Sequence, residues 1–326
     1  MAEDDVVLDL VREAPLPGMQ PNVLLAAGHD LVLGGVDHPL AAIYAGESDA
    51  DPGPAFCDLI RSHPDEVRWY LEHRRTNTNE CGRTAVLVPA LRWVTDVVGE
   101  PIVLLDGGSS AGLNLHLDRY RLDYGDAGAT GPADAPVRIE CAVTGDAPIE
   151  STAPQIVARI GLDRSPVDLT DDADVRWQLA CVWPDTVRLD RTRAAIELAR
   201  AAPVEIVQGD LIDDLASTAA RLPSGPPLCV MTSWVLAYVP GRQRPAFLEA
   251  MAALSHDRSV VWLSAEGPGV VRELPAPVGN STVEGVVPSV LGVVHFEGGQ
   301  QVAADALATC HPHGSSLAWS APTRRR

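Results

Sequence analysis

The clearest signal for the fold of this chain is the stretch Ile102-Val103-Leu104-Leu105-Asp106-Gly107-Gly108-Ser109-Ser110-Ala111-Gly112-Leu113-Asn114. Four apolar residues end on a carboxylate, pass through a glycine-rich turn and continue into an amphipathic run, Leu113 to Tyr120. The pattern predicts a buried strand, a tight turn and the start of a helix. Glycines let a ligand approach the backbone, and the free N–H groups of a helix start favour an anion. The carboxylate of Asp106 suits hydroxyls or a cation, so the segment predicts a site for a nucleotide-like ligand.

The glycine turn can be compared with several motifs. Its glycines do not supply the dinucleotide-binding pattern G-x-G-x-x-G. Residues 108–112 satisfy G-x-S-x-G, the nucleophile elbow of an α/β-hydrolase, with Ser110 as the nucleophile. Residues 106–112 resemble the first motif of S-adenosylmethionine-dependent methyltransferases, an acid followed by spaced small residues. Small residues that only allow close helix–strand packing would explain the glycines, but they would not explain the acid.

Composition excludes several classes of partner and chemistry. The chain has 326 residues, of which 46% are hydrophobic, enough for one large domain or a domain with an appendage. Its net charge of −19 repels phosphate backbones and anionic membranes, so we expect a small-molecule substrate rather than nucleic acid or a membrane. All 25 basic residues are arginine, which excludes a Schiff-base, pyridoxal-phosphate or P-loop lysine.

The cysteines and the N-terminus indicate a reducing cytoplasm. The six cysteines form no C-x-x-C pair, and most have apolar neighbours, so we expect buried free thiols. Residues 1–9 carry four acids and no basic residue, unlike a signal peptide, and no apolar run approaches the ~20 residues of a membrane span. His311 and His313 flank Pro312, but without a second cluster they predict a turn between strands, and we expect no metal centre.

The order of apolar patterns predicts two domains. Residues 1–98 are expected to form a helical N-terminal cap, with helices over 22–36, 55–75 and 82–98. Residues 99–326 are expected to form an α/β domain, with an inserted β-hairpin at about 122–150. Within that domain the expected strands lie near 102–106, 158–163, 204–209, 227–233 and 258–264, followed by closing strands over 292–296, 302–308 and 316–319.

Topology favours a methyltransferase-like fold over a hydrolase. The elbow strand of an α/β-hydrolase lies in mid-sheet after several earlier strands, whereas 102–106 is the first convincing strand of this chain. A hydrolase would also need a downstream acid, such as Asp210 or Asp257, and then a histidine, for which the candidates are His295, His311 and His313. The fold class we predict is α/β: a doubly wound, mostly parallel, Rossmann-like methyltransferase sheet with an antiparallel C-terminal strand.

Two further carboxylates follow predicted strands. Asp163 ends the strand over 158–163, and Asp210 follows the strand over 204–209. In an open parallel sheet, ligands bind beyond the carboxyl ends of the strands, near the point where the strand order reverses. There Asp163 would accept hydrogen bonds from two ribose hydroxyls and Asp210 from an adenine amino group. Each acid alone is also a common turn residue, so the inference rests on three such acids in order.

Several longer segments resemble one known family. They are residues 105–124, residues 74–83, Gly161-Leu162-Asp163 with Ala180-Cys181-Val182-Trp183-Pro184, Gln20-Pro21-Asn22, Asp37-His38-Pro39-Leu40, and His311-Pro312-His313-Gly314. Together they resemble an uncharacterised bacterial and archaeal family known as domain of unknown function 2332. The resemblance covers nearly the whole chain and implies a class I methyltransferase-like fold. It implies no particular substrate.

These observations predict an S-adenosylmethionine site and a small-molecule methyltransferase. The alternatives are an acyl hydrolase using Ser110 and a non-catalytic ligand-sensing or interaction protein. The predicted cofactor-binding residues are Asp106, Gly107, Gly108, Ser109, Ser110, Gly112, Asn114, Asp163, Asp210 and Leu211.

The acceptor side is expected at the end of the strand over 227–233. That region lacks the Asp/Asn-Pro-Pro-aromatic motif of amino-methylating nucleic-acid enzymes, and its candidate catalytic residues are Ser233, Tyr238 and Glu266. The segment 74–80 carries more side-chain hydrogen-bonding groups than one helix cap requires. We therefore expect it to form a lid over the pocket at residues 107–112. The lid candidates are Arg75, Asn77, Asn79 and Glu80.

Overall fold

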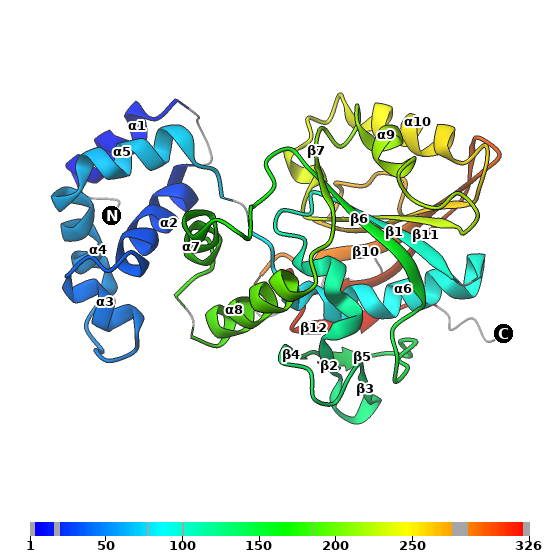
Figure 1. Ribbon diagram of the computed structural model, residues 1–326, viewed down its shortest axis with the longest axis horizontal. Coiled ribbons are helices and arrows are strands. Elements are labelled where there is room, and N and C mark those ends of the chain that lie inside the picture. The colour runs from blue at the N-terminus through cyan, green and yellow to red at the C-terminus, as the bar shows by residue number, and fades with distance from the viewer. Residues whose placement is uncertain are drawn as a thin grey trace. The chain divides into compact units, whose positions relative to one another are not determined.

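The computed structural model describes residues 4–15, 20–76, 78–99, 101–184, 186–275 and 286–321 (Figure 1). The chain forms two compact units: unit 1 comprises Met1–Thr78 and Val167–Arg200, and unit 2 comprises Asn79–Pro166 and Ala201–Arg326. The sequence predicted one boundary near residue 98, whereas these units divide the chain at three places. Within the described ranges, no helix is both long enough and apolar enough to cross a membrane.

Unit 1 is helical. Its elements are α1 (Asp5–Glu13), α2 (Gln20–Leu33), α3 (Pro39–Tyr44), α4 (Pro52–Ser62), α5 (Pro64–His73), α7 (Asp172–Ala180) and α8 (Thr186–Ala201), the last of which ends one residue beyond the unit. The single helix expected over 55–75 is wrong, because Pro64 lacks the N–H of a helix interior and instead begins α5. A close approach joins α2 to α4: a Cβ atom on Gly28 would lie 2.5 Å from Cε2 of Phe56.

Unit 2 contains a nine-stranded, mostly parallel sheet, in the order β5-β12-β11-β10-β9-β8-β1-β6-β7. Its strands are β1 (Ile102–Gly107), β5 (Ala142–Thr144), β6 (Ile156–Asp163), β7 (Ile206–Gln208), β8 (Leu228–Ser233), β9 (Val260–Glu266), β10 (Ser289–Glu297), β11 (Gln300–Cys310) and β12 (Ser316–Trp319). Five neighbouring strands pair in parallel, in the order β9-β8-β1-β6-β7. All of the strands predicted from apolar runs are confirmed, and the central strands β1, β8 and β9 are buried along their whole length.

Beyond β9 the strands up to β12 pair antiparallel, and the edge strand β5 pairs parallel with β12. β10 pairs antiparallel with both β9 and β11, and β11 pairs antiparallel with β12. The insertion between β1 and β6 forms a small sheet from β2 (Arg121–Asp123), β3 (Ala129–Thr130) and β4 (Arg138–Glu140), in the order β3-β2-β4. Its antiparallel β2–β3 pair is the expected hairpin, and β5 extends the insertion into the large sheet. The fold is therefore a mixed α/β sheet with N-terminal helices.

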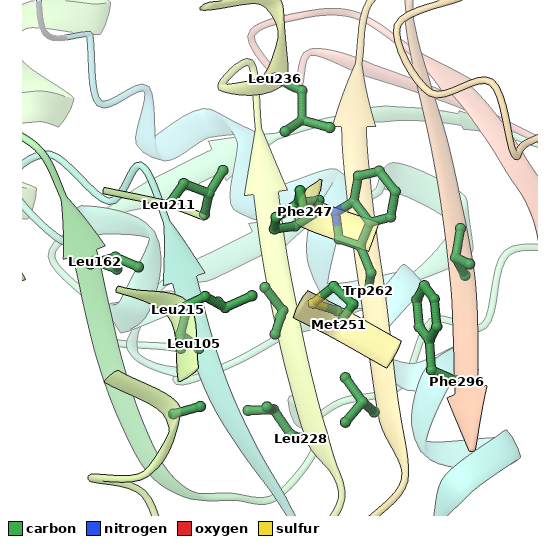
Figure 2. Close-up of a cluster of buried hydrophobic side chains, with 14 of the residues drawn as sticks. Leu105, Leu162, Leu211, Leu215, Leu228, Leu236, Phe247, Met251, Trp262 and Phe296 are labelled. Atoms are coloured by element: carbon green, nitrogen blue, oxygen red, sulfur yellow. The ribbon is translucent and has the colours of Figure 1, made fainter. Parts of the chain in front are cut away.

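One face of the sheet packs on two helices, α9 (Leu215–Ala219) and α10 (Arg244–Leu254). Figure 2 shows the core of this face, a buried cluster that includes Leu105 and Trp262 of the strands and Phe247 and Met251 of α10. Each fully buried large apolar side chain contributes roughly 1.5–3 kcal/mol. The opposite face is covered by α6 (Thr84–Val98), which contacts β9 and β10. Helices thus hold both faces, and the carboxyl edge of the parallel strands is left to turns.

Candidate functional site

The strand order reverses between β1 and β8. From β1 the chain passes outward to β6 and β7 on one side, and then returns to build β8 and β9 on the other. Loops diverge at such a point, which leaves a crevice beyond the carboxyl ends of the two strands. Acidic or hydroxyl residues lie at the carboxyl ends of four neighbouring parallel strands: Asp106 in β1, Asp163 in β6, Ser233 in β8 and Glu266 in β9. Their position makes this edge the candidate site.

The turn after β1 is bound to the end of β6. The backbone N–H groups of Gly108 and Ser109 donate to the carbonyl of Leu162, at 2.7 Å and 3.4 Å. The N–H of Ser110 donates to Oδ2 of Asp163 at 2.8 Å. These three N–H groups of the turn are therefore not free, since β6 supplies their acceptors.

The segment after the turn is a 3₁₀ helix, η2 (Leu113–Arg119), rather than the start of an α-helix. Gly112 precedes it with a φ of 71°, and the helical geometry is interrupted at His116. The N–H of Leu113, the first residue of η2, donates to Oδ1 of Asn79 at 2.7 Å. No α-helix N-terminus points at the site here, so an anion would need a different partner.

Side chains of the protein lie close against the glycines of the turn. A Cβ atom on Gly107 would lie 2.5 Å from Cδ1 of Leu211, and one on Gly108 would lie 2.3 Å from Cγ2 of Val235. A Cβ atom on Gly161 of β6 would lie 2.4 Å from Oγ of Ser109. The glycines thus permit close packing of the turns, and Leu211 and Val235 are the apolar side chains packed against them.

Two turns of the site have strained backbone. Ser110, after β1, has a φ of 53°, and Trp234, after β8, has a φ of 56°. In the described part of the chain these are the non-glycine residues with positive φ. For a bulky side chain such as Trp this conformation is costly, and strain of this kind gathers at functional sites. Both strained turns lie beside the reversal of strand order.

Asp106 is a buried acid without a partner for one oxygen. Its side chain is 2% exposed, and Oδ2 forms no hydrogen bond. Burial, together with the charge of Asp163, raises the pKa of Asp106 to about 8, although Arg83 opposes this shift. Asp106 is therefore mostly protonated at neutral pH, and its carboxyl group can donate as well as accept.

Glu266 binds the turn after β8. Its Oε1 accepts from the N–H groups of Val235 and Leu236, at 2.9 Å and 3.0 Å, whereas the buried Oε2 has no partner. Burial raises the pKa of Glu266, and the two backbone hydrogen bonds limit the rise. This carboxylate holds the strained turn with one oxygen, while its other oxygen is buried and unpartnered.

Arg83 is a site residue that sequence reasoning missed. It ends a 3₁₀ turn, η1 (Cys81–Arg83), which leads into α6. Its Nε donates to the carbonyl of Pro312 at 3.0 Å, and its Nη1 donates to the carbonyl of Ser233 at 3.1 Å. A Cβ atom on Gly314 would lie 2.0 Å from the carbonyl oxygen of Gly82. Two segments that carry the family resemblance, 74–83 and 311–314, therefore meet beside the site.

The family assignment follows from comparison over the whole length of the chain. The family model described as "Uncharacterized protein conserved in bacteria (DUF2332)" matches residues 1–319. The chain belongs to the DUF2332 family. Comparison with curated proteins finds no match. The resemblance predicted from the sequence is thus confirmed, and membership of DUF2332 does not assign an activity.

In the DUF2332 chain Asp163 ends β6 and Asp210 follows β7, as expected, but each already accepts hydrogen bonds from the protein. Asp163 accepts from the N–H of Ser110 with Oδ2 and from the N–H of Ser165 with Oδ1, both at 2.8 Å. Asp210 pairs with Arg164 and accepts from the N–H of Ile212 at 2.7 Å. Burial alone would raise the pKa of Asp210, but these hydrogen bonds hold it below its usual range.

The remaining predicted cofactor and catalytic residues differ in exposure. Ser109, Asn114 and Ser233 are buried, and the side-chain oxygen of each has no hydrogen-bond partner. Leu211 is also buried, whereas the Tyr238 side chain is 59% exposed in the short helix η4 (Leu236–Tyr238).

The predicted lid residues fall in different parts of the DUF2332 chain. Asn79 and Glu80 belong to unit 2, where Oε1 of Glu80 accepts from the N–H of Gly82 at 2.9 Å. Arg75 belongs to unit 1, and its Nη1 donates to the carbonyl of Arg74 at 2.7 Å. Asn77 lies outside the described residues. The contact of Asn79 with Leu113 fixes this segment to η2, and the lid itself stays a prediction.

Proposed function

We propose that this chain binds S-adenosylmethionine and transfers its methyl group to a small molecule. The observation that carries the proposal is the position of Asp106 and Asp163 at adjacent carboxyl ends, beside the reversal of strand order between β1 and β8. Nucleoside ligands bind at this point of open α/β sheets, with an acidic residue on the ribose hydroxyls. The net charge of −19 supports a small acceptor over a nucleic acid.

The residues at this edge fit such a cofactor. Each carboxylate oxygen of Asp163 accepts one backbone N–H and keeps lone-pair capacity for a ribose hydroxyl. Asp210 would accept from the adenine amino group, in competition with its ion pair to Arg164. Leu211 and Val235 offer apolar contact beside the glycine turn. When bound, S-adenosylmethionine supplies an electrophilic methyl group at this edge.

The part played by the protein in such a reaction is mainly to position the acceptor. Holding two reactants in line supplies much of the rate, and a base assists when the acceptor must lose a proton. Glu266 is the proposed base, because Oε2 is buried and unpartnered and burial raises its pKa. Ser233 and the exposed Tyr238 are the proposed acceptor-side partners. We place the reaction in the cytoplasm, which the six free cysteines support.

The direct test is turnover. The purified chain is incubated with S-adenosylmethionine and a panel of small amines, alcohols and carboxylic acids, and S-adenosylhomocysteine is measured. Product that depends on one class of acceptor supports the proposal. Cofactor binding without product from any acceptor would instead indicate a non-catalytic ligand-sensing or interaction protein with the same site.

One observation favours a hydrolase as the second candidate. Ser110 combines the G-x-S-x-G pattern with a φ of 53°, the strained backbone expected of a nucleophile elbow. Against this, η2 replaces the α-helix that follows an elbow, and His295 is hydrogen-bonded to Ser259 at 2.8 Å near the amino end of β9. Labelling by a serine-directed fluorophosphonate distinguishes the two functions.

A further inference from the structure

Arg83 is a buried cation that forms no ion pair with a described residue. Its side chain is 9% exposed, and two of its N–H donors are used on the carbonyls of Pro312 and Ser233. A guanidinium has five N–H donors in a planar fork, so most of its donating capacity remains. Buried guanidinium groups are normally matched by a carboxylate or phosphate. Arg83 therefore has the capacity to bind an anionic group at this edge.

Unmatched oxygens surround this cation. Oδ2 of Asp106, Oε2 of Glu266 and Oγ of Ser233 are all buried and have no hydrogen-bond partner. Glu80 has the largest electrostatic interaction with Arg83, and Glu266 and Asp106 also interact with it. Ser233 accepts a hydrogen bond from Arg83 through its backbone carbonyl. One buried cation and several buried acceptors thus gather at the ends of β1, β8 and β9 without satisfying one another.

Few ligand groups would pair with both the remaining N–H donors of Arg83 and the unpartnered oxygens around it. A carboxylate fits the planar fork of Arg83 but would leave the acids unmatched, and an amine would do the reverse. Phosphate carries no strong donor for Asp106 or Glu266. An α-amino carboxylate carries an acceptor pair and a donor group a few bonds apart. An α-amino carboxylate is also a zwitterion, so it adds no net charge to this buried cluster.

We propose that Arg83, Asp106, Ser233 and Glu266 form a recognition site for an α-amino carboxylate group. Arg83 binds the carboxylate, and the oxygens of the other three residues accept from the ammonium. The group belongs either to a free amino acid or to the amino-acid end of S-adenosylmethionine. The second source rests on the proposed function, whereas the first does not. With the second source Ser233 and Glu266 contact the cofactor, and Tyr238 remains the acceptor-side partner.

Calorimetric titration with chosen probes tests the site. The probes are S-adenosylhomocysteine, 5′-methylthioadenosine, which lacks the amino carboxylate, and a panel of free amino acids. If the cofactor is the source, S-adenosylhomocysteine binds the native chain at least about tenfold more tightly than 5′-methylthioadenosine. Arg83→Gln removes most of that preference and leaves the affinity for 5′-methylthioadenosine unchanged.

Arg258→Gln is the matched control. Arg258 also donates to two backbone carbonyls, those of Pro223 and Ala219, but it precedes the amino end of β9. This variant should keep the preference for S-adenosylhomocysteine. If Arg83→Gln does not fold, as judged by circular dichroism, Glu266→Gln and Asp106→Asn replace it, and each should reduce the same preference.

The outcomes of these titrations distinguish a free amino acid from S-adenosylmethionine as the ligand, and both from the absence of such a site. A free amino acid that binds together with S-adenosylhomocysteine, and is lost in Arg83→Gln, identifies an acceptor amino acid. If neither nucleoside binds but an amino acid does, the proposed function fails while this site stands. Equal affinities of the two nucleosides with no amino acid bound, or affinities that Arg83→Gln leaves unchanged in a folded protein, overturn the site.

Discussion

Val235 lies against the backbone of Gly108, so that a Cβ atom on Gly108 would stand 2.3 Å from Cγ2 of Val235. This contact joins the turn after β1 to the turn after β8, across the reversal of strand order. Gly108 also has a φ of 77°, a conformation that L side chains rarely adopt. The two turns of the candidate site are therefore built as one packed unit, and a change in one is expected to displace the other.

Gly108→Ala is expected to destabilise the chain by about 1–3 kcal/mol, through overpacking against Val235 and an unfavourable φ. Denaturant unfolding measures the loss. Adding Val235→Ala should recover only part of it, because the second substitution removes the clash but not the backbone strain. Gly225→Ala is the control, since nothing lies within 4 Å of a Cβ atom there and φ is not positive. A loss in Gly108→Ala no greater than in the control would contradict the contact.

Asp106 should make stability fall as pH rises. Its pKa in the folded chain is about 8, above the ordinary value of 3.8, so the folded state holds a proton that the unfolded state releases. Its contribution is fully present below pH 3.8, declines above that value and is lost as pH passes about 8. The free energy of unfolding of the native chain, minus that of Asp106→Asn, should therefore decrease between pH 5 and 8. A difference that is flat or rising would contradict a buried, protonated Asp106.

Asn79→Ala should destabilise the chain by roughly 1–3 kcal/mol, because the buried N–H of Leu113 would lose its acceptor. Thr78→Ala, at an exposed neighbour, is the control and should change stability by less than about 0.5 kcal/mol. Thermal or denaturant unfolding of both variants checks this. Equal stability of the two variants would show that Asn79 does not hold the start of η2.

Ser110 gives the test of the second candidate function. For a methyltransferase-like site, Ser110→Ala should change cofactor affinity much less than Asp163→Ala, and a fluorophosphonate should not label the native chain. A hydrolase would show the reverse: labelling at Ser110, and esterase turnover lost in Ser110→Ala. Mass spectrometry of the labelled protein identifies the modified residue.

The sheet and its edge could be predicted from sequence because their signals are local. Each central buried strand is a short apolar run, and Asp163 is the last residue of β6 while Asp106 is the last but one of β1. Arg83 could not be found in this way. Its partners are carbonyls 150 and 229 residues further along the chain, and a carbonyl leaves no mark on the sequence.

Other differences have physical causes that act at a distance. The segment after Gly112 has the composition of a helix start, yet its first N–H is bound by Asn79, and it forms a 3₁₀ helix. Residues 167–200 follow β6 in sequence but join unit 1, where Trp177 stacks on Tyr70 of α5. By contrast, the break at Pro64 was visible in the sequence, since proline disfavours a helix interior.

Calorimetric titration of the native chain and of Asp163→Ala with S-adenosylhomocysteine tests whether a nucleoside binds at the carboxyl ends of β1 and β6. Binding to the native chain is expected, and Asp163→Ala should weaken it by about 1–3 kcal/mol, since ribose hydroxyls would lose their acceptor. Asp213→Ala, an exposed acid next in sequence to the Asp210 turn, should leave the affinity unchanged. Absence of binding to the native chain at millimolar ligand, or equal affinity of the native chain and Asp163→Ala, would contradict a nucleoside site at the carboxyl ends of β1 and β6.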